Sequence, residues 1–192
     1  MSVEGRPLDE QEQILRAKNG DVAAFEMLVR SHQQIALRVA YLVVGDANVA
    51  EDVTQEAFVK AYRALPRFRA EGSFRPWLLR IVRNEALNNR RAWGRQERLA
   101  LRLAHDPVSG GAAPPPETTV MTGIERETVL AAVGELPDRY RDIVSLRYLL
   151  GLSEAETAAT LGVPLGTVKS RTARALDRLE SALSALKEVG DD

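Results

Sequence analysis

The sequence predicts an all-α fold in which two small helical domains are joined by a flexible linker. Apolar residues recur every three or four positions over most of the 192 residues, which is the period of a helix face. Aromatic residues make up only 5% of the chain, whereas Ala, Leu, Val and Arg dominate, a composition that suits helices better than sheets. Between residues 95 and 123 the composition changes to a segment rich in Pro and Gly, which is typical of a linker.

The first domain is expected to span residues 8–94, with helices separated by Gly, Pro and capping residues. A short acidic helix is expected over 8–20, followed by a long helix that Asp21 caps and Gly45 ends. A third helix should run from a cap at Asp46 or Asn48 to about Leu65, and a fourth from Phe74 to about Trp93. A loop over 66–73 precedes the fourth helix, because Pro, Gly and charged residues interrupt the periodicity there. The third helix should bury Val53, Ala57, Phe58, Ala61 and Leu65, and the fourth Trp77, Leu78, Ile81 and Leu87.

The second domain is expected over residues 124–188 and begins with two helices. The first runs from Ile124 to Gly134, and the second starts at Leu136-Pro137-Asp138 and ends at Gly151. The second should present Ile143, Val144, Leu146 and Leu149 to the core.

A helix-turn-helix over 152–178 completes this domain. Ser153 and Glu156 have the spacing of a capping box, which begins the first helix of the motif. Gly162 can take the positive φ that ends that helix, and Pro164 prevents its continuation. A second helix then starts near Thr167 and extends to about residue 189.

The second helix of the motif is basic and slim. It carries Lys169, Arg171, Arg174 and Arg178 among small residues, so it can enter a DNA major groove. The pattern favours DNA binding, but an ordinary helical hairpin with a solvated basic face is an open alternative.

The third helix of the first domain carries an acidic patch of four neighbouring polar side chains: Glu51, Asp52, Gln55 and Glu56. Three interpretations are open, namely a solvated helix face, a carboxylate metal site and a docking surface for a basic partner. A metal would usually need ligands from facing helices, and none is apparent. The charge pattern alone favours the solvated face.

Positive charge gathers in the second half of the first domain. From Lys60 to Arg102 there are twelve Lys and Arg against three Glu, in a chain with a net charge of −1. One face of the fourth helix carries four of these arginines together with two neutral amides: Arg80, Arg83, Asn84, Asn88, Arg90 and Arg91. A loop followed by such a helix can hold unstacked bases of single-stranded DNA. A plain basic surface helix is an equally consistent alternative.

Several classes of function are excluded. The chain has no Cys, so disulfides, thiolate metal sites and thiol catalysis are absent, and its two His, His32 and His105, are far apart in sequence. No catalytic cluster is apparent, so we expect neither an enzyme nor a metal or other cofactor. No apolar run can span a bilayer and no signal peptide is present, so we expect a cytoplasmic protein without membrane insertion.

The order of short motifs resembles the extracytoplasmic-function (ECF) group of bacterial sigma-70 factors. In the first domain these motifs are Gly20-Asp21-x-x-Ala24-Phe25-x-x-Leu28, Gly45-Asp46, Ala50-Glu51-Asp52-Val53-x-Gln55-Glu56-Ala57-Phe58, Phe68, Phe74-x-Pro76-Trp77-Leu78-x-x-Ile81-x-x-Asn84 and Arg91. In the second they are Leu136-Pro137, Gly151-Leu152-Ser153, Leu161-Gly162-Val163-Pro164 and Gly166-Thr167-Val168-Lys169-Ser170-Arg171.

The resemblance implies a transcription-initiation factor with sigma region 2 at 8–94 and sigma region 4 at 124–188. Implied partners are core RNA polymerase, through its β′ clamp helices and β subunit, promoter DNA, and an anti-sigma factor. The rival hypothesis is a helix-turn-helix regulator that acts without docking on core polymerase.

The resemblance also assigns roles to individual residues. The acidic patch of Glu51, Asp52, Gln55 and Glu56 would dock on polymerase, which reverses the choice made on charge alone. Thr167, Lys169, Ser170, Arg171 and Arg174 would contact the −35 element. Arg69, Ser73, Arg80, Asn84 and Arg91 would contact the −10 element.

The sequence departs from the family pattern at a few positions. Thr157 and Thr160 stand where larger aliphatic residues are common, so we expect looser packing or hydroxyls bonded back to the helix backbone. Leu165 replaces a common acidic residue, and Asn88 replaces a common Asp.

Overall fold

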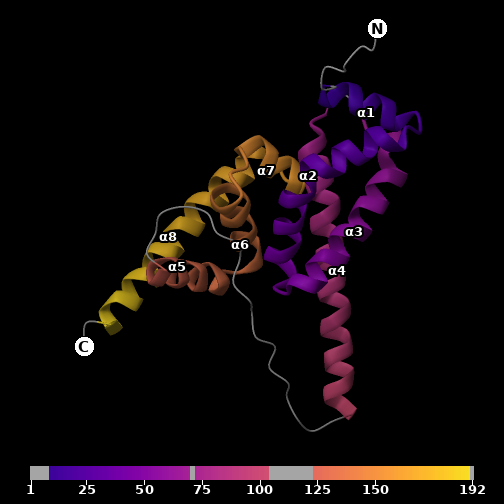
Figure 1. The fold of residues 1–192 in the computed structure, drawn as a ribbon. Coiled ribbons are helices and arrows are strands. Elements are labelled where there is room, and N and C mark those ends of the chain that lie inside the picture. Colours follow the sequence, from indigo (N-terminus) through magenta and orange to yellow (C-terminus); the bar gives the residue numbers. More distant parts are fainter. Residues whose placement is uncertain (1–8, 70–71, 104–122, 191–192) are drawn as a thin grey trace. The chain divides into compact units, whose positions relative to one another are not determined.

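The computed structural model describes residues 9–69, 72–103 and 123–190. The chain divides into two compact units, Met1–Ala113 and Pro114–Asp192. Within the described ranges every regular element is a helix, which confirms the predicted all-α fold (Figure 1). Residues 104–122, which make up most of the predicted linker, lie outside the described residues.

The first unit is built on three helices that pack against one another. These are α2 (Val22–Val44), α3 (Ala47–Ala64) and α4 (Phe74–Leu103), while α1 (Glu10–Lys18) packs against α2 and against the short 3-10 turn η1 (Leu65–Arg67). The core takes small and large side chains from all of them: Ile14, Leu28, Ala36, Val39, Ala50, Val53, Ala57, Ala61, Leu65, Phe74, Leu78, Leu79 and Val82. The predicted inward stripe of the third helix is buried throughout, so that prediction is confirmed.

The predicted caps of the first unit are confirmed. The Asp21 side chain accepts a hydrogen bond from the Ala24 N–H at 3.1 Å and begins α2. Gly45 ends α2 in the left-handed region, at φ 77°. Asp46 rather than Asn48 caps α3, by accepting from the Val49 N–H at 2.9 Å.

Helix α4 differs from its prediction in length and in phase. It continues through residues 95–103, where the linker was predicted to begin, and in Figure 1 its far half extends beyond α2 and α3. Strong helix formers follow Gly94 and outweigh the cost of about 1 kcal/mol for a single Gly. Leu79, Val82 and Ala86 are fully buried, whereas Ile81 and Leu87 are only half-buried, so the inward face was misplaced by about one residue.

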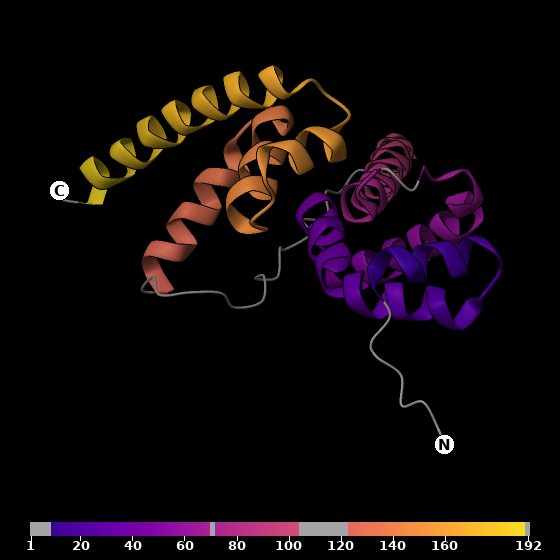
Figure 2. The same ribbon diagram turned by 90° about the horizontal axis from the view of Figure 1, so that it is seen from above.

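The second unit places the long helix α8 (Leu165–Gly190) against three shorter helices (Figure 2). These are α5 (Gly123–Glu135), α6 (Asp138–Val144) and α7 (Glu154–Leu161), with a π turn, η2 (Ser145–Leu149), between α6 and α7. Ala132, Val133, Leu136, Tyr140, Val144, Ala175 and Leu179 form its main cluster of buried residues.

The π turn explains one error in the predicted core. Ile143, Val144 and Leu146 are buried as predicted, but Leu149 is 36% exposed. The wide turn adds a residue to the helical repeat, closing with a bond from the Leu150 N–H to the Ser145 carbonyl at 3.0 Å. Leu149, the last residue of this turn, is therefore rotated away from the face that a regular helix would bury.

The helix-turn-helix forms as predicted. Ser153 accepts from the Glu156 N–H at 3.2 Å, and the Glu156 side chain accepts from the Ser153 N–H at 2.8 Å. Gly162 ends α7 at φ 67°, and α8 begins at Leu165, two residues before the predicted start.

Thr157 and Thr160 are fully buried on α7, each with 0% exposure. Their hydroxyl oxygens have no hydrogen-bond partner among the residues that the structure describes, so the expectation that they bond back to the helix backbone is wrong. A buried hydroxyl without a partner loses its bonds to water and gains none in return. These two side chains therefore weaken the second unit.

Thr157→Val should stabilise the second unit, because it removes a buried, unpartnered hydroxyl and keeps the shape of the side chain. The expected gain is about 1 kcal/mol in the free energy of unfolding, measured by calorimetric unfolding of the full chain. Thr172→Val is the matched control, since the Thr172 hydroxyl donates to the Val168 carbonyl at 2.8 Å. Equal behaviour of the two variants would contradict the prediction.

Asp21→Ala should destabilise the first unit in a pH-dependent way. The bond from the Ala24 N–H, followed by the one from Arg16, lowers the pKa of the Asp21 carboxyl below its usual 3.8. Such a group stabilises the fold above its unfolded pKa, and this stabilisation is lost as the pH falls through its folded pKa. The thermal midpoint of the variant should thus be lower than that of the wild type near neutral pH. The two midpoints should converge as the pH falls below 3.8. A constant difference across the titration would argue against this role.

Candidate nucleic-acid interface

The first half of α8 presents a polar face. Thr167, Ser170, Arg171 and Arg174 are three, four and seven residues apart, so they lie on one side of the helix. Val168, Ala175 and Leu179 are buried on an adjacent side, about 100° around the helix from Thr167. Four of the five residues predicted for the −35 element are thus brought together.

Lys169 lies apart from these four. It is about 200° around the helix from Thr167. Its ammonium lies 3.9 Å from a Glu154 carboxylate oxygen on α7, and its side chain is 63% exposed. Lys169 therefore connects the two helices of the motif and remains accessible to an anion.

Arg174 belongs to a cluster of cations around Tyr140. The guanidinium carbons of Arg139 and Arg178 lie 4.8 and 5.2 Å from the centre of the Tyr140 ring. Burial raises the pKa of the Tyr140 hydroxyl. The charge of Arg139, hydrogen bonds from Arg139 and Arg174 and the charge of Arg178 outweigh that effect, so the pKa lies below its usual value of 10.0.

A cleft of about 600 Å³ opens beside this cluster, between α5, the start of α6 and α8. Its lining includes the apolar side chains of Leu136 and Ala182, the ring of Tyr140, and charges of both signs from Glu135, Arg174, Asp177 and Arg178. Arg174 thus lies at the junction of the polar face of α8 and this cleft.

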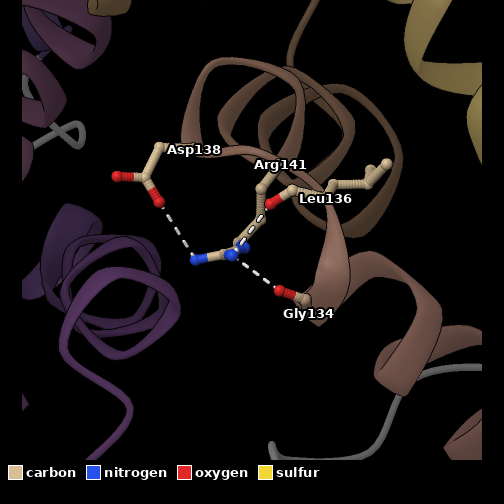
Figure 3. A network of polar contacts seen from close by, with 4 residues as sticks. All are labelled: Gly134, Leu136, Asp138 and Arg141. Carbon is tan, nitrogen blue, oxygen red and sulfur yellow. Dashed lines mark hydrogen bonds and ion pairs between the residues drawn. The ribbon is translucent and has the colours of Figure 1, made fainter.

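Arg141 has a structural role instead (Figure 3). One of its terminal nitrogens donates to the carbonyls of Gly134 and Leu136 at 2.6 and 2.8 Å, and the other to Asp138 at 3.2 Å. Arg147 similarly donates to the Leu152 carbonyl at 2.6 Å. Both satisfy carbonyls at helix ends and connections and so fix the helices that support α8.

In the first unit, Arg80, Asn84 and Arg91 lie on one side of α4. They fall within about 40° of one another around the helix, and all three are exposed. Leu78, Leu79 and Val82 are buried on the other side.

Arg69 and Ser73 stand at the two ends of the loop before α4, and both are exposed. The Gly72 N–H donates to the Arg69 carbonyl at 3.0 Å and closes the base of this loop. The structure therefore places the two residues near one another, while residues 70 and 71 lie outside the described part of the chain.

An aromatic cluster lies beneath this loop. The Phe68 ring lies 5.9 Å from Phe74, edge to face, and 4.8 Å from Trp77, and Phe74 lies 5.3 Å from His32 on α2. Phe68 and Phe74 are buried and Trp77 is half-buried. Trp77 thus packs within the unit, as its helical spacing predicts.

The acidic patch, Glu51, Asp52, Gln55 and Glu56, is exposed along α3, opposite the buried Ala50, Val53 and Ala57. Among the residues that the structure describes, no three His, Asp or Glu side chains converge as they would to hold a metal ion. The patch is a continuous negative surface.

Comparison with known families decides between the hypotheses. A family model of sigma-70 region 2 matches residues 28–96, and one of sigma-70 region 4 matches residues 126–179. The chain is 37% identical over 183 residues to the RNA polymerase sigma-H factor of Pseudomonas aeruginosa, covering 92% of this chain and 95% of that protein. It is also 37% identical over 187 residues to the ECF RNA polymerase sigma-E factor of Escherichia coli K12, covering 93% and 96%.

The chain belongs to the ECF group of sigma-70 factors. It is thus an RNA polymerase sigma factor, a protein of transcription initiation. The rival hypothesis of a regulator that acts without polymerase is not favoured, because the match extends over region 2 as well as the helix-turn-helix.

Solved structures agree with this assignment. The fold of this sigma factor is similar to that of CnrH, solved in complex with the cytosolic domain of CnrY, with a TM-score of 0.67 and 29% identity over 92% of this chain and 97% of that one. The sigma factor RpoE of Bartonella quintana, solved with the anti-sigma factor NepR, has a TM-score of 0.68. At 24% identity it supports the fold alone.

Sequence reasoning missed contacts between distant positions. Nothing in the local pattern around Tyr140 indicates that cations of α8 surround it, and nothing indicates that Arg141 donates to backbone carbonyls.

No helix in the described part of this sigma factor combines the length and hydropathy needed to cross a membrane.

Proposed function

We propose that this sigma factor is a non-enzymatic, cytoplasmic subunit that binds core RNA polymerase and directs it to two-part promoters. The observation that carries the proposal is that three polar surfaces lie on helices that bury another of their faces in the core. One negative and one positive surface lie on the first unit, and a second positive surface lies on the helix-turn-helix. Residues 8–94 would serve polymerase and the −10 element, residues 124–188 the −35 element, and residues 95–123 would link them.

In the second unit, α8 would enter the major groove of the −35 element. Arg171 and Arg174 have side chains that can pair bidentately with guanine. Thr167, near the helix N-terminus, together with Lys169 and Ser170, would hold phosphates and so fix the orientation of the helix. The exposure of Lys169, Ser170 and Arg174 and the shared side of four of the five residues support this role.

In the first unit, the loop before α4 would capture a base of the −10 element. Extruding a base from the duplex costs a few kcal/mol, which a pocket with preformed donors can offset. Arg69 and Ser73 would flank the captured base. Arg80, Asn84 and Arg91, spread over about 16 Å of helix, would follow the backbone of the single strand.

The acidic patch of α3 would dock on the β′ clamp helices of polymerase, and the second unit would reach the β subunit. Four adjacent acidic or amide side chains on an exposed helix attract a basic surface of similar length. Exposure of all four, with the core stripe behind them, supports this use over a metal site.

An anti-sigma factor would hold this protein inactive. The support is that proteins of this fold were solved with partners: CnrH, at 29% identity, with the cytosolic domain of CnrY, and RpoE of Bartonella quintana with an anti-sigma factor. Run-off transcription with purified core polymerase tests the whole proposal. Promoter-specific transcripts are expected only when this protein is added, and their absence on every promoter tested would overturn it.

Glu51→Lys combined with Asp52→Lys should abolish binding to core polymerase, because the patch would repel a basic surface. The fold should be unaffected, since both side chains are exposed. Co-elution with core polymerase is the measurement. Glu12→Lys with Glu26→Lys is the control, because it makes the same change of charge at exposed sites outside the patch. Undiminished co-elution of the patch variant would rule out this docking surface.

Arg171→Ala should weaken binding to the −35 duplex by about 1–3 kcal/mol if the residue reads a base. The variant should lose specificity at the one base pair that Arg171 reads. Its affinities for the wild-type duplex and for a duplex substituted at that base pair should therefore differ less than those of the wild-type protein. Fluorescence anisotropy with a labelled duplex measures both quantities. A uniform loss across all sequences would instead assign Arg171 to a phosphate.

A further inference from the structure

Helix α1 lies outside the segment that the region 2 family model matches, which begins at residue 28. It nevertheless packs against α2 and against the 3-10 turn that leads into the loop before α4. One of its polar side chains contacts the start of that loop directly, and another contacts a residue of α2 that packs on the end of the loop.

The first contact is at the start of the loop. The Lys18 ammonium at the end of α1 donates to the Phe68 carbonyl at 2.7 Å, across 50 positions of sequence. This carbonyl follows η1, and Lys18 is partly buried against it. A hydrogen bond from a charged donor is shorter and stronger than one between neutral groups. Lys18 therefore holds the backbone at Phe68 in one position.

The second contact is at the end of the loop and passes through His32. The His32 ring is 8% exposed, and its Nε2 lies 2.7 Å from a Glu10 carboxylate oxygen. Since a carboxylate accepts, Nε2 carries the proton and donates. The same ring packs on that of Phe74, the first residue of α4, with the ring centres 5.3 Å apart. Glu10 thus orients the ring against which the end of the loop packs.

The two ends are also joined to one another. Phe68 and Phe74 pack edge to face at 5.9 Å, and the Gly72 N–H bonds to the Arg69 carbonyl at 3.0 Å. A Cβ at Gly72 would lie 3.3 Å from that carbonyl oxygen, so the turn leaves little room for a side chain. Lys18 and Glu10 thus hold a frame in which Phe68 and Phe74 are fixed relative to each other.

We propose that α1 is a positioning element for the −10 loop, with Lys18 and the Glu10–His32 pair as its positioning residues. The inference rests on the proposed function, in which Arg69 and Ser73 flank a captured base. Arg69 directly follows Phe68, and Ser73 directly precedes Phe74, the two phenylalanines that this frame fixes. A frame ordered before DNA binds reduces the ordering cost of capture, so loosening α1 should weaken capture without removing any DNA contact.

The test is Lys18→Met in the full chain, assembled with core polymerase. The probe is a promoter duplex that the wild-type protein opens, with 2-aminopurine at the captured −10 position. We expect roughly tenfold less open complex at equilibrium, the loss typical of one charge-assisted hydrogen bond. Binding to core polymerase and to an isolated −35 duplex should be unchanged. Lys18→Arg should restore opening.

Arg16→Met is the matched control. It removes the same charge from the same helix, but Arg16 pairs with the nearby Asp21 at 2.6 Å and not with the loop. Glu10→Ala is the second variant, because Glu10 is half exposed and its loss leaves the core intact. It should reduce opening in the same direction as Lys18→Met.

The outcomes separate the two hypotheses. If the wild-type protein opens no promoter, the proposed function fails. If the wild type opens DNA and both Lys18→Met and Glu10→Ala do so equally well, the positioning role of α1 is overturned. It is also overturned if core binding and thermal stability fall in parallel with opening, since the contacts would then serve only the fold.

Discussion

One constraint governs both units: a helix in a small domain must bury one side, and the residues left on the other side are those available to partners. In α3, burial of Ala50, Val53 and Ala57 leaves Glu51 and Asp52 exposed. In α4 the same rule exposes Arg80 and Arg91, and in α8 it exposes Arg174 and Arg178. The negative and positive surfaces of this sigma factor are therefore consequences of its core, and a substitution that rotated a helix would displace a surface as a whole.

The arginines of the second unit divide into two groups by what they contact. Arg141 and Arg147 donate to backbone carbonyls at helix ends and connections, which would otherwise lack partners. Those of α8 lie on its exposed polar side, where Arg174 and Arg178 also surround Tyr140. Composition alone cannot separate these groups, because a guanidinium suits a carbonyl, an aromatic ring and a phosphate equally well. Only the distance to a partner identifies the role of each.

Much of the fold could be predicted because its signals are local. A cap such as Asp21 and the capping box at Ser153 depend on residues three positions apart, and their geometry follows from spacing. The sequence pattern did not predict where α4 ends, because the helix propensity of the residues after Gly94 outweighs the cost of that glycine. It did not predict the exposure of Leu149 either, because the π turn changes the helical repeat and the spacing of apolar residues does not reveal such a turn. The candidate surfaces were predicted from residue type, but the bond from Lys18 to Phe68 joins positions that the sequence separates by 50 residues.

Arg174 and Arg171 illustrate how the supporting contacts decide what a variant can reveal. Arg174 lines the same cleft as the buried Tyr140 and helps to lower the pKa of its hydroxyl, so its replacement would alter both the exposed side of α8 and the surroundings of a residue that packs α6 against that helix. For Arg171 the described residues provide no such partner. A loss of DNA binding on replacing Arg171 can thus be attributed to the contact itself, whereas the same loss at Arg174 would combine a contact with a shift of the helix that presents it. Since Tyr140 of α6 packs against α8, the proposed recognition by α8 would depend on a residue that is itself buried.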